Sequence, residues 1–76
     1  MASYNGHKNW NHWNVSLWIN NDEGLYRLAR MACRDQINRD AAARYFIDCM
    51  AQCGSTKTPD GAPYSVSSVR AAMVGM

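Results

Sequence analysis

The sequence predicts an all-α protein, a small single-domain bundle of about four helices. In most of the chain, apolar residues recur at the three- and four-residue spacing that places them on one face of a helix. Asparagine, aspartate and serine, which cap helices, precede these apolar stretches. The 76 residues are enough for one domain, residues 1–76, with a flexible polar arm at residues 1–8. The predicted helices lie at about residues 11–20, 22–34, 38–53 and 65–74.

Composition and charge argue against several classes of protein. A net charge of +2 is a weak signal for nucleic-acid binding, since such domains usually have a pI above about 9. Three cysteines, an odd number, do not suit the disulfide framework of a secreted domain, so we predict a cytoplasmic location. The N-terminal stretch lacks the apolar core of a signal peptide, and no apolar run approaches the ~18 residues of a membrane-spanning helix. We therefore predict no membrane association.

The first predicted helix, at about residues 11–20, is ambiguous between helix and strand. The stretch NWNHWNVSLWINND contains all three tryptophans of the chain. Alternating apolar positions from residue 13 to residue 19 fit a strand, but a strand would place Trp18 on the wrong face. A helix instead groups the tryptophans with Leu17. We therefore favour a helix with Trp10, Trp13, Leu17 and Trp18 on one face. Trp13 and Trp18 are predicted to lie in the core, and the burial of Trp10 is left open.

This first helix also offers a cap and a spare apolar flank. Asn9 or Asn11 can cap it, because an asparagine side-chain oxygen accepts a hydrogen bond from a free backbone N–H group. Val15 and Ile19, spaced by four residues, fall on a flank of the predicted buried face. A chain of this size often covers such a flank by pairing, so Val15 and Ile19 form a candidate homodimer interface.

The second predicted helix begins at a group of capping residues. Asn21 or Asp22 can cap it, and Asp22 and Glu23 lie in its first turn, where the positive end of the helix dipole favours carboxylates. Continuing its apolar stripe past residue 34 would bury Gln36 and Asp40, so the stretch DQIN is predicted to separate two helices. The stripe consists of Leu25, Leu28, Ala29 and Ala32.

The third and fourth predicted helices are separated by a loop at residues 55–64. Asn38 is predicted to cap the third helix and Gly54 to end it, as glycine after a helix often does. In the loop, the stretch from Thr58 to Gly61 suits a turn in which proline fixes φ at the second position. Ser65 can cap the fourth helix. The expected apolar faces are Ala42, Tyr45, Phe46, Cys49, Met50 and Cys53 in the third helix, and Val66, Val69, Met73 and Met76 in the fourth.

Arginines form a basic stripe on the second predicted helix. Arg27, Arg30 and Arg34 have helical spacing and could meet phosphates or an acidic protein surface. Glu23 lies four residues before Arg27 and is predicted to pair with it. By the same spacing Arg44 is predicted to pair with Asp40 or Asp48, and Arg39 with Asp35 if the helix persists there. Arg30 and Arg34 have no such neighbour and are predicted to stay unpaired, as is Arg70. The stripe makes a small nucleic-acid-binding accessory or regulatory protein the alternative function.

The reactive side chains do not form a recognisable catalytic arrangement. Cysteine and histidine are present, but no third catalytic group and no oxyanion-forming turn accompany them, so we predict no enzymatic activity and no cofactor. Cys49 and Cys53 could face one zinc ion, with Cys33, His7 and His12 as further candidate ligands. Because the close C-x2-C pair of zinc domains is absent, we favour the interpretation that these cysteines are small hydrophobes of the core face.

Candidate contact residues occur in two parts of the chain. Trp10 lies near the start of the first predicted helix, and His12 and Asn14 lie on its polar side. Tryptophan and arginine are among the residue types enriched in binding hot spots. The predicted partner-binding residues are therefore Trp10, His12, Asn14, Arg30 and Arg34.

The stretch from Trp13 to Glu23 reads W-N-V-x-L-W-I-x-N-D-E and is preceded by Asn9. This signature resembles one in small proteins of bacteriophages, plasmids and similar mobile elements, over about residues 5–28. The resemblance implies a protein of the bacterial host cytoplasm that binds one host protein complex, such as a CRISPR–Cas or another defence effector. Many anti-CRISPR proteins are strongly acidic DNA mimics, and this chain is mildly basic. The implied mode of inhibition is therefore occlusion of a site or locking of a conformation.

Overall fold

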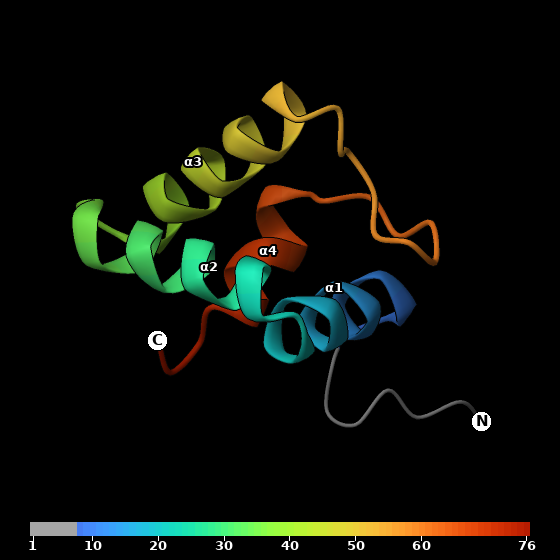
Figure 1. Ribbon diagram of the computed structural model, residues 1–76. Coiled ribbons are helices and arrows are strands. Elements are labelled where there is room, and N and C mark those ends of the chain that lie inside the picture. Colours follow the sequence, from blue (N-terminus) through green and yellow to red (C-terminus); the bar gives the residue numbers. More distant parts are fainter. Residues whose placement is uncertain (1–7) are drawn as a thin grey trace.

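The computed structural model describes residues 8–76, which form four α-helices (Figure 1). The predicted all-α class is confirmed, and each helix boundary lies within two residues of its expected position. Both α2 and α4 pack against α1 and α3. No helix in this part of the chain is long and apolar enough to cross a membrane. The predicted arm at residues 1–8 lies, except for Lys8, outside the described residues. The helices are α1 (Trp10–Asn21), α2 (Glu23–Asp35), α3 (Arg39–Gln52) and α4 (Val66–Ala72).

Each helix begins at a side-chain cap that the sequence suggested. An oxygen of each capping side chain accepts a hydrogen bond from the backbone N–H group three residues later, at 2.8–3.1 Å. Such a cap contributes about 1 kcal/mol, because it satisfies an N–H group that has no partner within the helix. The four caps are Asn9, Asp22, Asn38 and Ser65.

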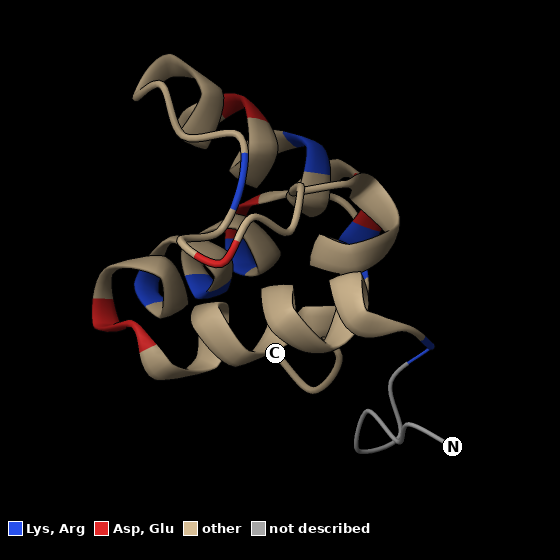
Figure 2. Ribbon diagram, turned by 90° about the vertical axis from the view of Figure 1, so that its right-hand side faces the viewer, with Lys and Arg blue, Asp and Glu red and all other residues tan. Residues whose placement is uncertain are grey.

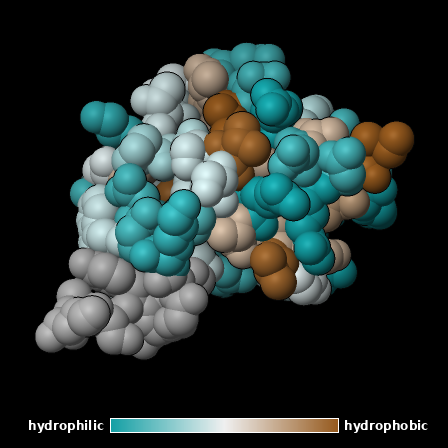
Figure 3. All heavy atoms as spheres, turned by 180° about the vertical axis from the view of Figure 1, so that it is seen from behind, coloured by the Kyte–Doolittle hydropathy of each residue, from teal (hydrophilic) through white to brown (hydrophobic). Residues whose placement is uncertain are grey.

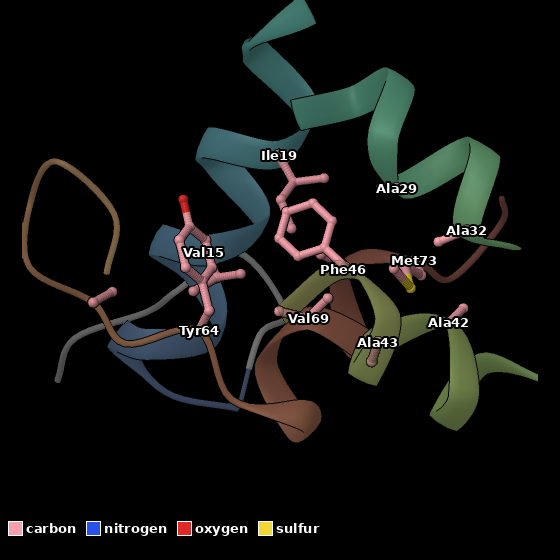
Figure 4. Packing of buried hydrophobic residues seen from close by; sticks show 12 residues of the cluster. Val15, Ile19, Ala29, Ala32, Ala42, Ala43, Phe46, Tyr64, Val69 and Met73 are labelled. Atoms are coloured by element: carbon pink, nitrogen blue, oxygen red, sulfur yellow. The ribbon is translucent and has the colours of Figure 1, made fainter. Parts of the chain in front are cut away.

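The core lies where all four helices meet, around the fully buried ring of Phe46 (Figure 4). This ring makes an edge-to-face contact with Tyr64, with 5.6 Å between the ring centroids. Small residues of α2 and α3 allow the helices to approach closely around it. The buried hydrophobic residues are Val15, Ile19, Ala29, Ala32, Ala42, Ala43, Phe46, Ala62, Tyr64, Val69, Ala72 and Met73.

The prediction of which α1 face is buried was wrong. Val15 and Ile19, expected on a flank, are fully buried. Trp13 and Trp18, expected in the core, are only partly buried, and Leu17 is 38% exposed. Both sides of α1 carry apolar residues, so helical spacing alone does not distinguish them. Because Val15 and Ile19 pack in the core, they are not available as a homodimer interface.

The apolar faces of the later helices were predicted more closely. The α2 stripe is confirmed: Ala29 and Ala32 are buried, and its two leucines pack against the core. In α3 the expected face was too wide, since Tyr45 and Cys53 are exposed. The predicted end of α3 is confirmed by Gly54, whose φ of +79° is a conformation that glycine adopts without strain.

The loop between α3 and α4 descends beside α1 (Figure 1) and contributes to the core. The predicted turn is confirmed by a 2.8 Å hydrogen bond from the backbone N–H of Gly61 to the carbonyl of Thr58. The N–H of Thr58 in turn donates to the carbonyl of Ala62 at 2.8 Å. The sequence did not indicate that Thr58, Ala62 and Tyr64 would be buried.

Four side chains connect α1 to this loop in a hydrogen-bond network, here called the α1–loop network. The Nδ2 of Asn14 and the Nε1 of Trp18 both donate to Oδ2 of Asp60, each at 2.9 Å. The hydroxyl of Thr58 donates to Oδ1 of Asn14 at 2.6 Å. The asparagine and the second tryptophan of the W-N-V-x-L-W signature therefore hold the loop against the helix.

The α1–loop network makes stability depend on pH. The hydrogen bonds from Asn14 and Trp18 hold the pKa of Asp60 below its ordinary value. The stabilisation from the ionised Asp60 is therefore fully present above about pH 3.9, the unfolded-state pKa. It is lost as the pH falls through the lower pKa of the folded state. We expect Asp60→Asn to flatten this acid decline in the unfolding free energy, measured by urea denaturation at a series of pH values.

The control for this experiment is Asp48→Asn, which removes an exposed carboxylate of α3. This variant should retain the acid decline of the wild-type protein. An equally steep decline in Asp60→Asn would show that other groups cause it.

Candidate functional site

The structure disperses the predicted contact residues of α1. Trp10 is partly exposed at the start of the helix, as expected. The Nε2 of His12 forms a 2.9 Å hydrogen bond with the Ser67 hydroxyl, which ties α1 to α4. The expectation that Asn14 lies on an exposed polar side was wrong, because it is only 1% exposed and belongs to the α1–loop network. These three residues do not form one surface.

The predicted residues of α2 do come together. Arg30 and Arg34 line a surface hollow of about 660 Å³, here called the arginine groove. Figure 2 shows the basic residues as blue bands along α2, after the acidic residues at its start. The groove is lined by Tyr26, Arg27, Arg30, Met31, Arg34 and Met76.

The arginines of the groove differ in how they are paired. Arg27 forms the predicted ion pair with Glu23. The prediction that Arg34 is unpaired was wrong: its Nε lies 3.2 Å from Oδ1 of Asp35, an ion pair between adjacent residues.

The guanidinium of Arg30 is held by an aromatic ring instead. It lies 5.8 Å from the ring centroid of Tyr26, and its Nη1 donates a long hydrogen bond of 3.4 Å to the tyrosine hydroxyl. In the described part of the chain, no carboxylate pairs with Arg30. An incoming anion therefore meets an oriented, uncompensated cation at this point of the groove.

The local sequence explains most of the groove. Residues three or four apart on a helix are neighbours, so Tyr26, Arg30 and Arg34 lie along one face of α2. Met76 is brought to this helix from the other end of the chain, after a turn at Gly75 with φ of +89°. The spacing of Tyr26 before Arg30 was a usable signal that the prediction missed. The sequence pattern placed Met76 on the apolar face of the fourth helix and did not indicate that it would lie beside α2.

A second hollow, of about 530 Å³, lies between α4 and the first turn of α3 and is here called the α4 hollow. Arg70, which was predicted to be unpaired, forms an ion pair with Asp40 at 3.2 Å. The side chains of this pair remain 59% and 52% exposed, so water screens their attraction. The hollow is lined by Arg39, Asp40, Val66, Ser67, Arg70, Ala71 and Val74.

The cysteines are free thiols. Cys33 and Cys49 are partly buried, and Cys53 is exposed rather than on the core face. Burial raises the pKa of the Cys33 thiol, and the charges of Arg39 and Arg30 act in the opposite direction. Among residues 8–76, no group of three or more histidine, cysteine or acidic side chains could hold a metal ion. His7, one of the candidate zinc ligands, lies outside the described residues.

The fold and the two hollows define a class: a small all-α protein that presents arginine-lined surface hollows. The chain belongs to a family of unknown function, DUF7249, which matches residues 1–76. No curated protein and no solved structure matches the chain.

Proposed function

We propose that this protein is a non-enzymatic binding protein that attaches to a host protein through the arginine groove and inhibits it by occlusion or by locking one conformation. The single observation that carries the proposal is the position of Arg30. Its guanidinium is oriented by Tyr26 and is not paired with a carboxylate in the described residues. Such a group can bind a carboxylate of a partner without first breaking an ion pair.

The other lining residues support protein binding. Tyrosine and arginine are enriched in hot spots of protein interfaces. Methionine is flexible and polarizable, so Met31 and Met76 can adapt to an apolar side chain of a partner. The groove thus offers charged and apolar contacts side by side, which is the mixture that protein surfaces present.

The resemblance of residues 13–23 to proteins of mobile elements supplies the biological context of the proposal. It makes a bacterial defence complex, such as a CRISPR–Cas effector, the first class of target to test. The inhibitor would act in the cytoplasm of the bacterial host, and it would need no cofactor and no membrane.

The groove predicts the effect of charge reversal. Arg30→Glu combined with Arg34→Glu should abolish binding. Each arginine can form a charge-assisted hydrogen bond with a partner carboxylate, which contributes about 1.5–3 kcal/mol. In the double variant, glutamates would instead repel these carboxylates. We expect the tagged wild-type protein to retain one dominant protein complex from nuclease-treated bacterial lysate, identified by mass spectrometry. The double variant should lose this complex while its helical circular dichroism stays unchanged.

Arg44→Glu combined with Lys57→Glu is the matched control, because it changes the net charge equally at exposed residues outside both hollows. Retention of the complex by both double variants would remove the groove from the proposal. Nucleic acid is the alternative partner: if nuclease removes every captured protein, the contacts were bridged by nucleic acid. Binding would then weaken steeply with salt.

A further inference from the structure

The α4 hollow and the arginine groove share the C-terminal segment of the chain as a wall. Val74 lines the α4 hollow, and Met76 lines the groove. Only Gly75 separates these two residues, so their Cα atoms are at most ~7 Å apart. Five of the six arginines in the chain line one hollow or the other.

The arginines of the two hollows are paired in a pattern that leaves one free in each. Glu23, Asp35 and Asp40 form ion pairs with arginines of the two hollows. In the described residues, Arg30 in the groove and Arg39 in the α4 hollow have no carboxylate partner. The predicted pairing of Arg39 with Asp35 was wrong, because α2 ends at Asp35 and this carboxylate pairs with Arg34. Arg39 is the first residue of α3, which packs against α2, the helix that carries Arg30.

We propose that the arginine groove and the α4 hollow form one docking surface for an acidic segment of a partner protein, in which carboxylates alternate with apolar side chains. This inference rests on the proposed function and specifies its partner. Carboxylates of the segment bind Arg30 and Arg39. Its apolar side chains pack on Met31 and Met76 in the groove, and on Val66 and Val74 in the α4 hollow.

The charge of this surface favours a protein segment over a nucleic acid. Five arginines and the three carboxylates paired with them leave a net charge of +2 across both hollows. A nucleic-acid backbone carries a phosphate at every nucleotide, so its charges would also meet Glu23, Asp35 and Asp40. An acidic protein segment places its charges farther apart and has apolar groups for the spaces between them.

Exposed apolar side chains lie beside charged ones on this surface, which suits a partner segment in which carboxylates alternate with apolar side chains. Val74, beside the paired Arg70, is 69% exposed, so its side chain is accessible to an apolar group of a partner. In the view from behind, hydrophobic atoms form separate patches set among hydrophilic atoms (Figure 3). Hydrophobic and hydrophilic side chains are therefore mixed on this face of the molecule.

The probe for this proposal is a fluorescein-labelled peptide of about eight residues in which glutamate and leucine alternate. Fully extended, it spans up to ~28 Å, which is enough to cross the 26 Å width of the molecule. We expect it to bind the full chain and to shift backbone amide NMR signals in both α2 and residues 66–74. Peptides with glutamine for glutamate, or with serine for leucine, should each bind more weakly.

Arg39→Gln tests the α4 hollow, and Arg44→Gln is its control, because Arg44 is exposed on the same helix and lines neither hollow. Loss of one exposed charge contact should weaken peptide binding about three- to fivefold in Arg39→Gln and by less than about twofold in Arg44→Gln. Val74→Ser should weaken binding of the glutamate–leucine peptide but not that of the glutamate–serine peptide.

Several results would overturn the proposal. If Arg39→Gln and Arg44→Gln weaken peptide binding equally, the effect is one of net charge. This result would exclude the α4 hollow from the docking surface even if Arg30→Gln still weakened peptide binding. Tighter binding of single-stranded DNA at the same salt concentration would assign the surface to nucleic acid. An absence of binding by the glutamate–leucine peptide at millimolar concentration would reject the acidic segment. The lysate experiment with charge-reversed arginines tests the proposed function separately.

Discussion

Phe46→Ala is expected to lower the free energy of unfolding by about 3–5 kcal/mol. The ring is fully buried among helices α1, α2 and α4 and contacts Tyr64 edge to face (Figure 4). Its removal leaves a cavity that the small residues around it cannot fill. A chain of this size is stable by only about 4–11 kcal/mol, so much of the folded population should be lost.

Urea denaturation followed by circular dichroism measures this effect. Tyr45→Ala is a matched control, because it removes an aromatic ring from the adjacent position of α3 that is 37% exposed. This control should cost about 1 kcal/mol or less. Similar losses for the two variants would mean that Phe46 is not the centre of the core.

Asn14→Asp is expected to destabilise the protein by at least ~3 kcal/mol at neutral pH. The substitution places a second carboxylate against Asp60, whose Oδ2 lies 2.9 Å from the Asn14 amide nitrogen, at a position that is 1% exposed. Burial and the charge of Asp60 both raise the pKa of the new carboxyl in the folded state. The destabilisation relative to wild type should therefore shrink as the pH falls and this carboxyl takes up a proton.

Asn20→Asp makes the same chemical change at an exposed position of the same helix, where the amide donates to the Ser16 carbonyl at 2.8 Å. It should change the unfolding free energy by about 0.5 kcal/mol or less. Urea denaturation of both variants at neutral and acidic pH provides the comparison. An equal loss of unfolding free energy in both variants would contradict a buried role for Asn14. A loss in Asn14→Asp that grows toward acidic pH would contradict it as well.

The caps and ends of the helices followed from short stretches of sequence. Asn9, Asp22, Asn38 and Ser65 each bond to an N–H group three residues later, and Gly54 adopts a conformation that favours glycine. These features depend on residues within about one helical turn, so reading neighbouring residues is enough to find them.

The buried face of α1 could not be predicted from neighbouring residues alone. Helical spacing groups the tryptophans with Leu17 on one face, and this face was predicted to be buried. In the structure, Val15 and Ile19 occupy the core, and Trp18 turns its indole N–H to Asp60 in the distant loop. The alternative face was visible in the sequence, but the partner that decided between the faces was not.

In the candidate site, too, some features follow from the local sequence and others depend on tertiary contacts. The row of Arg27, Arg30 and Arg34 on one side of α2 was evident from helical spacing, which depends only on the local backbone. The apolar wall supplied by Met76 and the ion pair between Arg70 and Asp40 join segments far apart in the chain. Helix positions and arginine spacing are thus local properties of the sequence. The buried face of α1, the α1–loop network and the joining of the two hollows were decided by tertiary packing, because each requires contacts between residues that no local pattern connects.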